Sequence, residues 1–527
     1  MKRFLFSIAL SLCVMLSWAQ FSGSGSGTSS DPYLIFYADQ LQQVRNYLDQ
    51  SGVYFKLMSN IDLTQWLTNN NPGQGWEPIG TSSAPFKGVF DGNNKKLTGF
   101  SINRTTDYVG LFGYTSSATI KNLTIEGDVK GGSYTGAFVG YADGGTLSNL
   151  VHNGNTTGSS STGGIAGYTS ASISNASVTG NVTGTQYTGG VVGEANSGTL
   201  SSLTYSGIVQ GTSSVGGIVG RAIASTISNC QASQKIKGSG DIVGGVCGSA
   251  EERTKVSDVK SYSTVEGVDC VGGIIGQTYG GIPDYIRNCL CFGDVTGRNY
   301  VAGIIGDVNN AMPEEPIDSF YVFVCNVTTN QVVKKYNYHS RSEKSSTSSQ
   351  SKVEKNCFIG NIHATGNYVA GIIGRSSSGQ SWSKGSSSAY FEPSHYYDYS
   401  TNYYSSTNYY YWKKEHGDTQ FSRITVSSSN KIYLPLYTCS LWTLSINDCY
   451  SSGNIEGQQY VGGITGTAQG VDIHNNYSSA SISGTANVGG IAGKADNISA
   501  YGEVVYSSLN PNRSLEIYSI PFSNDRH

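Results

Sequence analysis

The sequence predicts an all-β protein, folded as a right-handed parallel β-helix of about eleven coils of about 27 residues each. A glycine-rich hexad, such as VGGIVG ending at Gly220, recurs eleven times, and most copies lie 26 to 30 residues apart. Between the hexads, short β-branched runs alternate with Ser, Asn and Gly, without the 3.6-residue apolar stripe of a helix. A fixed period of this length is typical of solenoids, and parallel crossovers are usually right-handed.

The first residues predict export. Lys2 and Arg3 precede an apolar run from Phe4 to Leu16, which is shorter than a membrane span of about 20 residues. We interpret residues 1–19 as a signal peptide that is cleaved before Gln20. Residues 20–100 are the predicted lead-in, a small α+β cap with a helix near residues 38–50. No second apolar run of membrane length follows, so we expect no membrane span and an exported protein.

The hexads place the coils in residues 101–306, 356–374 and 446–510. They end at Gly113, Gly140, Gly167, Gly193, Gly220, Gly248, Gly276, Gly306, Gly374, Gly466 and Gly493. The fourth hexad position is always a large apolar residue, so it should fill the interior of the rod. Strand alternation then predicts that positions 2 and 6 also face inward and that position 5 faces outward. Glycine at positions 2 and 6 should allow close backbone approach, with a turn of positive φ available at position 6.

Two further columns follow each hexad. An Asn recurs two residues after an apolar residue, as in Ile120 and Asn122, and we expect it to lie where strands turn. The residue after it is mostly apolar, and it is Cys in four coils: Cys230, Cys289, Cys357 and Cys449. We interpret these cysteines as small buried apolar residues, with disulfides between neighbouring coils possible but not required.

Two insertions interrupt the coils at residues 307–355 and 375–445, and residues 511–527 form a C-terminal tail. The first insertion contains a predicted β-hairpin, and the second is dense in tyrosine. Both start directly after a hexad, so we expect them on one side of the rod, where repeat proteins often bind ligands. Aromatic side chains of the second insertion are the predicted binding residues, although such a segment also suits a loop without function. They are Trp382, Tyr390, Tyr396, Tyr397, Tyr403, Tyr404, Tyr409, Tyr410, Tyr411 and Trp412.

The fifth hexad position suggests where the insertions lie. It is Ile275, Ile305 and Ile373 in the coils beside the insertions, and a smaller residue in several others. If this position faces outward, these three isoleucines need a cover, because exposed apolar stripes are rare on soluble proteins. We therefore expect the insertions to fold back onto them.

Composition excludes some functions. The formal net charge is -3 and only 13% of residues are charged, so the chain lacks the basic footprint of a nucleic-acid-binding protein. Acidic residues are sparse within the coils and the histidines share no column, so we predict no enzyme activity, no catalytic residues, no metal site and no cofactor. A group in the second insertion is interpreted as a solvated loop rather than an acid–base or metal site: Glu392, His395, Asp398, Glu415, His416 and Asp418.

The hexad and the downstream apolar-x-Asn segment resemble those of the GLUG-motif repeat proteins, exported bacterial proteins described mostly as surface or adhesin-like. The resemblance covers about residues 28 to 510 apart from the insertions. It implies a surface or adhesin-like β-helical protein. With the aromatic residues of the second insertion, we expect a scaffold for adhesion or ligand binding whose partner is a glycan or protein of a host or neighbouring cell. The expected location is secreted or on the outer surface of a Gram-negative bacterium. The alternatives are a polysaccharide-active β-helix enzyme and a passive stalk of a longer surface protein.

Overall fold

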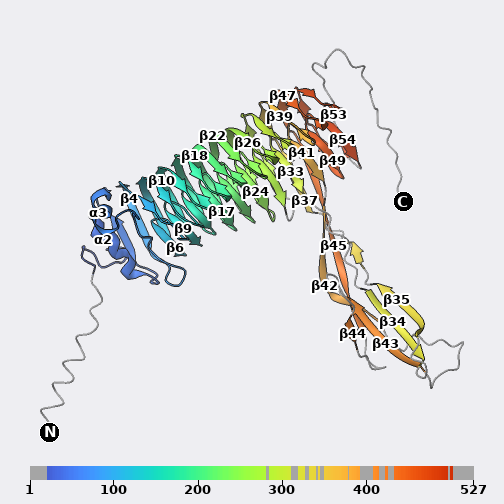
Figure 1. Cartoon of the computed structure of the whole chain (residues 1–527), viewed down its shortest axis with the longest axis horizontal. Coiled ribbons are helices and arrows are strands. Elements are labelled where there is room, and N and C mark those ends of the chain that lie inside the picture. The colour runs from blue at the N-terminus through green and yellow to red at the C-terminus, as the bar shows by residue number, and fades with distance from the viewer. Residues whose placement is uncertain are drawn as a thin grey trace, which may run out of the picture.

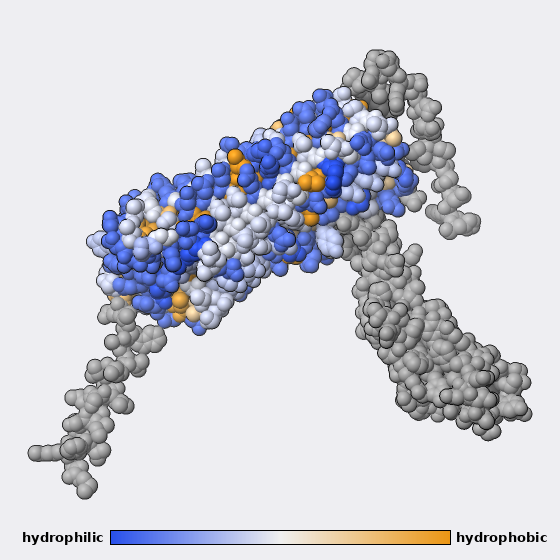
Figure 2. All heavy atoms as spheres, in the orientation of Figure 1, coloured by the Kyte–Doolittle hydropathy of each residue, from blue (hydrophilic) through white to orange (hydrophobic). Residues whose placement is uncertain are grey.

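The computed structural model describes residues 21–279, 284–309, 319–326, 332–339, 342–344, 349–377, 379–391, 407–414, 422–424, 432–496 and 499–501. Side chains are described in residues 21–279, 284–308, 351–377 and 444–496. Within these residues the predicted all-β parallel β-helix is confirmed, and its coils stack into one elongated rod (Figure 1). The face of the rod seen in Figure 2 is hydrophilic to intermediate in hydropathy, with scattered hydrophobic residues.

A small α+β unit caps the N-terminal end of the rod. It comprises β1 (Tyr33–Ile35), α2 (Ala38–Gln43), a 3-10 turn at Val44–Tyr47, β2 (Tyr54–Leu57), β3 (Ile61–Asp62), α3 (Thr64–Asn70) and β4 (Val89–Thr98). The helix predicted near residues 38–50 is thus shorter, since the chain becomes extended at Leu48. β1 pairs with β2, β2 with β4, and β4 with β7 (Thr119–Glu126), so the cap continues the parallel stacking of the rod.

One sheet, called sheet B here, contains one strand from each coil. Its eleven parallel strands match the eleven coils that the hexads predict. Each strand starts at the fifth hexad position or directly beside it. In chain order they are β6 (Phe112–Ser116), β9 (Val139–Asp143), β13 (Ala166–Thr169), β17 (Val192–Asn196), β20 (Val219–Ile223), β24 (Cys247–Glu251), β28 (Ile275–Tyr279), β33 (Ile305–Asn309), β41 (Ile373–Ser377), β49 (Thr465–Gln469) and β54 (Ala492–Asp496).

A nine-stranded sheet, called sheet C, holds the start of the hexad. Its strands are β12 (Thr162–Gly163), β16 (Gln186–Gly189), β19 (Ser213–Gly216), β23 (Val243–Gly244), β27 (Asp269–Gly272), β32 (Asn299–Ala302), β40 (Val369–Ala370), β48 (Gln459–Gly462) and β53 (Ala486–Gly489). A third and larger sheet, called sheet A, contains the remaining rod strands. It includes β7, β10 (Thr146–Asn153), β14 (Ser172–Thr179), β18 (Thr199–Gly211), β22 (Gln231–Gly238), β26 (Lys260–Glu266) and β37 (Ser349–Glu354).

Each hexad is the corner between sheets C and B. In the copy that ends at Gly220, the strand of sheet C ends at Gly216 and the strand of sheet B begins at Val219. The backbone N–H groups of Ile218 and Val219 both donate to the carbonyl of Val246 in the next coil, at 2.9 and 3.0 Å. This bend interrupts strand alternation, so the side chains of positions 4 and 5 both enter the interior, where each is fully buried.

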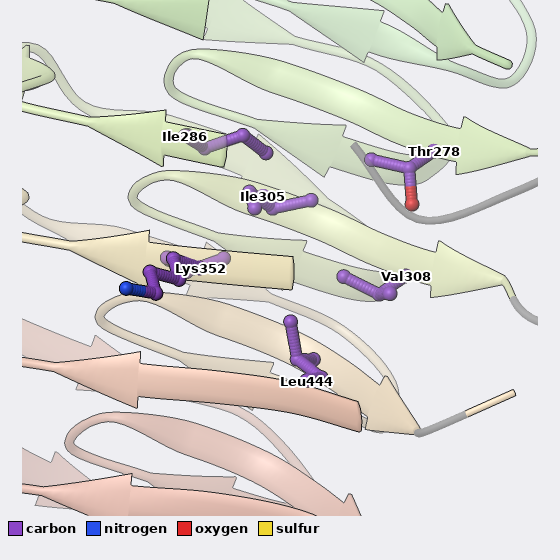
Figure 3. Close-up of a pocket in the computed structure, with 7 residues that line it drawn as sticks. Thr278, Ile286, Ile305, Val308, Lys352 and Leu444 are labelled. Carbon is purple, nitrogen blue, oxygen red and sulfur yellow. The ribbon is translucent and has the colours of Figure 1, made fainter. Parts of the chain in front are cut away.

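The prediction that position 5 faces outward is therefore wrong. Ile275, Ile305 and Ile373 are all fully buried in the rod and need no cover from the insertions. Figure 3 shows Ile305 among the interior residues Ile286, Val308 and Leu444. The idea that the insertions fold back onto an isoleucine stripe fails for the same reason.

Glycine is needed in the hexad because neighbouring backbone segments approach closely, and not because the chain turns there with a positive φ. A Cβ at Gly220 would lie 2.4 Å from the carbonyl carbon of Tyr187, and one at Gly216 would lie 2.1 Å from the carbonyl oxygen of Val219. No hexad glycine has a positive φ. The left-handed conformation falls instead on the residue before the β-branched start of each hexad, such as Tyr187 with φ of 51°.

The Asn column lies where the chain bends, as predicted, but in the first three coils this bend falls inside the strands β7, β10 and β14, whose pairing skips the Asn position. Asn122, Asn149 and Asn175 have φ between 53° and 56°, which asparagine tolerates better than most residues. The Asn149 amide donates to Asn122 Oδ1 at 2.8 Å, so part of the column forms a ladder between coils.

The cysteine column is confirmed with one change of register. Cys230, Cys289 and Cys449 are buried, and the seven cysteines with described side chains are free thiols. Cys357 lies one position further, paired with Leu290 and Tyr450, and Asn356 takes its place in the column. Asn356 is buried and accepts a hydrogen bond from the backbone of Cys289 at 3.0 Å. The sequence does not reveal this shift, because the first insertion separates this coil from the coil before it.

Candidate functional site: the arm and the tyrosine columns

Both insertions join to form one projecting unit, called the arm. β42 (Gly379–Phe391) and β45 (Ile432–Asn447) pair antiparallel from Gly379 opposite Trp442 to Phe391 opposite Ile432. They leave the rod as a long two-stranded stalk (Figure 1). A four-stranded antiparallel sheet at the far end has the order β35–β34–β43–β44. β34 (Ser319–Asn326) and β35 (Val332–His339) come from the first insertion, and β43 (Thr407–Lys414) and β44 (Ser422–Ile424) from the second.

The arm contains several predicted binding residues. Trp382 and Tyr390 lie in β42, and Tyr409, Tyr410, Tyr411 and Trp412 lie in β43. β43 pairs with β34, so Tyr409 through Trp412 lie opposite Val324 through Tyr321 of the first insertion. The hairpin predicted in the first insertion is confirmed as β34 and β35, with Ser319 opposite His339. Tyr396, Tyr397, Tyr403 and Tyr404 lie outside the described residues.

A column of residues, called the corner column, precedes the β-branched start of each hexad. All its members have φ between 51° and 66°. This conformation is costly for side chains other than Gly, Asn and Asp, and it is held here by the turn into sheet C. From the N-terminal end the column runs Tyr108, Tyr134, Ser161, Tyr187, Ser214, Ile242, Cys270, Tyr300, Tyr368, Tyr460 and Asn487.

A second column, called the flank column, follows the last glycine of each hexad. Its members are paired in register along sheet B, and nearly all are partly exposed on its outer side. From the N-terminal end they are Tyr114, Tyr141, Tyr168, Glu194, Arg221, Ser249, Gln277, Asp307, Arg375, Thr467 and Lys494. Because the corner column lies beside it, the two columns form one continuous strip along the rod.

The N-terminal section of this strip is aromatic. Tyr141 stacks on Tyr114 and on Tyr168, with ring centroids 4.7 and 4.1 Å apart. In the corner column, Tyr108 and Tyr134 stack at 5.1 Å, and Tyr134 meets the edge of Tyr141 at 5.5 Å. Burial of the half-exposed rings raises the pKa of Tyr114, Tyr134 and Tyr141, so all three are neutral at physiological pH.

Ion pairs occupy the flank column further along. Arg221 binds Glu251 with Nε and Nη2 at 3.0 and 2.7 Å and approaches Glu194 at 3.4 Å. Burial raises the pKa of Glu194 despite its cationic neighbour Arg221. Arg221 also lies over the ring of Tyr187, 5.1 Å from its centroid.

A second ion pair lies nearer the arm. Arg375 donates two hydrogen bonds of 2.7 Å to the two carboxylate oxygens of Asp307, whose side chain is 1% exposed. Its guanidinium lies 4.4 Å from the ring centroid of Tyr300, which stacks on Tyr368 at 4.8 Å. Aromatic rings and paired charges therefore alternate along the strip.

Neither of these two columns was predicted from the sequence. Tyrosines flank the hexad on both sides in DYVGLFGY and SYTGAFVGY, and a Tyr precedes it in QYTGGVVG, NYVAGIIG and QYVGGITG. Recurrence at a fixed distance from the hexad was the available signal. This signal is easily missed, because most rod tyrosines are single residues in the sequence. Only the stacking of the coils brings their side chains together.

Potential catalytic groups are dispersed in the described part of the rod. Among the side chains that the structure describes, no three His, Cys, Asp or Glu residues are grouped to hold a metal. His363 Nδ1 lies 3.0 Å from Glu456 Oε2 on an exposed surface, and His152 is fully buried. The group from Glu392 to Asp418 lies outside the described residues.

The fold and the repeated hexad define the class of protein: a parallel β-helix whose coils each carry a glycine-rich corner. The family model described as the GLUG motif matches residues 211–236, which confirms the resemblance. A "putative Gly-rich membrane protein" of Evansella cellulosilytica is 46% identical over 106 residues, which cover 20% of this chain and 12% of that protein. Halomucin of Haloquadratum walsbyi is 37% identical over 106 residues, 20% of this chain and 1% of that protein.

The matched segments thus span a small part of these relatives. A solved structure of a "putative immunoglobulin A1 protease" from Bacteroides ovatus is 21% identical, with a TM-score of 0.35, and covers 52% of this chain and 79% of that one. A likeness at this level supports no functional conclusion. In the described part of the chain, no helix is long and apolar enough to cross a membrane.

Proposed function

We propose that this protein is an exported binding scaffold of the bacterial cell surface or its surroundings, whose arm contacts a glycan or protein of a host or neighbouring cell. The observation that carries the proposal is the construction of the arm. Two insertions, separated by a complete coil, combine into one sheet at the end of a stalk. A segment with this architecture holds its far end away from the rod, where a large partner can reach it.

Aromatic residues of the arm supply the contact chemistry in this proposal. β43 contains Tyr409, Tyr410, Tyr411 and Trp412 in succession. Tyr and Trp combine a large apolar surface with a hydrogen-bonding group and lose little conformational entropy on binding, which suits both glycan and protein partners.

Location at the surface is supported by the sequence and by the relatives. Residues 1–19 have the pattern of a secretory signal, although they lie outside the described residues. The two relatives are named a "putative Gly-rich membrane protein" and halomucin. Assignment to a Gram-negative bacterium remains part of the proposal.

The test removes the far end of the arm and keeps the rod. Phe391 and Ile432 are directly paired, so an Asn-Gly turn can join them and close β42 and β45 as a hairpin. A Gly-Ser linker replaces residues 319–339. We expect this variant to lose binding to glycan arrays and immobilised matrix proteins that the full chain binds.

A matched variant separates chemistry from architecture. In this variant, serine replaces residues 409–412, which keeps the length of β43. We expect the variant to lose binding to the same glycans and proteins. A passive stalk predicts equal binding, or equal lack of binding, by all three proteins, and that outcome would contradict the proposal.

A further inference from the structure

The flank column is interrupted at Thr467, near the C-terminal end of the described rod. Its neighbours in the column are the long side chains of Arg375 and Lys494, paired with it in register. The short threonine leaves a surface cavity of about 300 Å³ between them. Three coils at the other end hold tyrosine at the same column position, and the parallel register of the strands is the same at both ends.

Aromatic rings form one wall of the cavity. Tyr368 and Tyr460 line it and stack on each other, with centroids 5.0 Å apart and planes 12° apart. The next residue of the corner column is Asn487, which is exposed. The column therefore provides no ring to cover the second face of Tyr460, unlike the rings in the middle of the tyrosine stacks.

Charges around the cavity balance. Arg375 is bound by both oxygens of Asp307, and Lys494 Nζ lies 3.1 Å from Asp496 Oδ2. Each cation is thus paired with a carboxylate, and of the two carboxylates Asp496 lines the cavity while Asp307 is buried. Thr467 and Gln469 add a hydroxyl and an amide to the lining, and the hydroxyl of Ser376 donates to the Thr467 carbonyl at 2.8 Å, which fixes the floor.

We propose that this cavity binds one unit of a neutral saccharide. Sugar hydroxyls both donate and accept hydrogen bonds, so they can use the oxygens of a paired carboxylate and the N–H groups of a paired cation together. The C–H face of a sugar ring can pack on Tyr460. A charged ligand would meet cations and carboxylates that already neutralise each other, which gives it no electrostatic advantage. This site deepens the proposed function by naming a ligand class, but it lies on the rod and does not depend on the arm.

The test fills the cavity. Thr467→Tyr places in the gap the residue that the column accepts at Tyr114, Tyr141 and Tyr168, so the rod should fold normally. Saturation-transfer NMR with glucose, galactose, mannose, N-acetylglucosamine and glucuronate measures binding to the full chain. We expect at least one neutral sugar to bind, and T467Y to weaken it by at least about tenfold.

Two further variants control the result. Thr179→Tyr makes the same change on an exposed position of sheet A and should bind as the wild type does. Tyr460→Ser removes one of the two rings of the aromatic wall and should weaken binding by about fivefold. Circular dichroism and thermal melting confirm that each variant is folded.

Several outcomes would overturn this inference: no neutral sugar binds the wild type, T467Y binds as tightly as the wild type, or glucuronate alone binds. The variant without the arm distinguishes this site from the proposed function. If that variant keeps all partners while T467Y loses the sugar, the arm proposal fails and the cavity stands. If the variant without the arm loses its partners while T467Y still binds the sugar, the cavity proposal fails and the arm proposal stands.

Discussion

The two sections of the flank column stabilise the rod by different means. Near the N-terminal end, Tyr114, Tyr141 and Tyr168 stack on one another, while further along Arg221 and Arg375 pair with carboxylates. Both sections have the same parallel register, and both lie above the same buried corner of two apolar residues. The interior therefore determines the backbone, and the outward columns are free to vary in chemistry.

The largest loss of stability should come from substituting the last glycine of the hexad, which is present in both sections. A Cβ at Gly140 would lie 2.5 Å from the carbonyl carbon of Tyr108, and one at Gly466 would lie 2.4 Å from the carbonyl oxygen of Gly374. Backbone cannot withdraw from such contacts, so G140A and G466A should each lose at least about 3 kcal/mol of stability or fail to fold. Denaturant unfolding measures the loss. A large cost in only one section would show that the two backbones differ.

The charged section should be the more sensitive to loss of one partner. R375M leaves the Asp307 carboxylate buried without a cation, which should cost about 3 kcal/mol of stability. The double variant D307N/R375M removes both charges and should recover most of that loss. A double-mutant cycle by thermal unfolding checks this, and equal costs for the single and double variants would contradict it.

The aromatic section should respond more mildly. Y141S removes two ring stacks of a half-buried side chain and should cost about 1.5 kcal/mol. Y141F keeps the rings in contact and should retain most of the stability. If Y141F loses as much as Y141S, the hydroxyl groups and not the rings hold this section together.

The smallest effect on stability at neutral pH should come from His152, which lies in the interior near the aromatic section. Burial lowers the pKa of His152, which is fully buried, whereas the C-terminal section has Ser451 at this column position. The unfolded chain takes up a proton below about pH 6.5 that the folded chain does not, so stability is lost as the pH falls through that value. H152V should reduce the drop in melting temperature between about pH 7.5 and about pH 5. An unchanged drop would assign the acid sensitivity to other groups.

The rod could be predicted from the sequence because each coil repeats its own corner. The hexad spacing predicts the number of coils, and Ile274 and its equivalents are buried as expected, except for the partly buried Ile491 in the last described coil. Ile275 was misplaced because strand alternation fails at a bend, where two successive side chains can turn inward. Cys357 was displaced by one position because an insertion separates its coil from the coil before it.

The candidate site was less accessible to prediction. The hairpin of β34 and β35 can be predicted from neighbouring residues in the sequence. The pairing of β34 with β43 joins strands from different insertions, and no local sequence pattern indicates it. Residues such as Tyr141 and Tyr168 become neighbours only through stacking of coils. The binding role of Trp382, Tyr390 and the β43 aromatics, and the boundaries between the segments, remain predictions.

Register across the insertions has a consequence for how such a chain can change over generations. Ile305 pairs directly with Ile373, and Ile373 with Thr465, although long segments separate them in the sequence. The coils before and after each insertion therefore stack in the same register as coils that are adjacent in the sequence. New modules can be acquired or exchanged at the ends of β33 and β41 while the inherited repeat remains intact, and the same two positions are the natural places to graft a foreign domain.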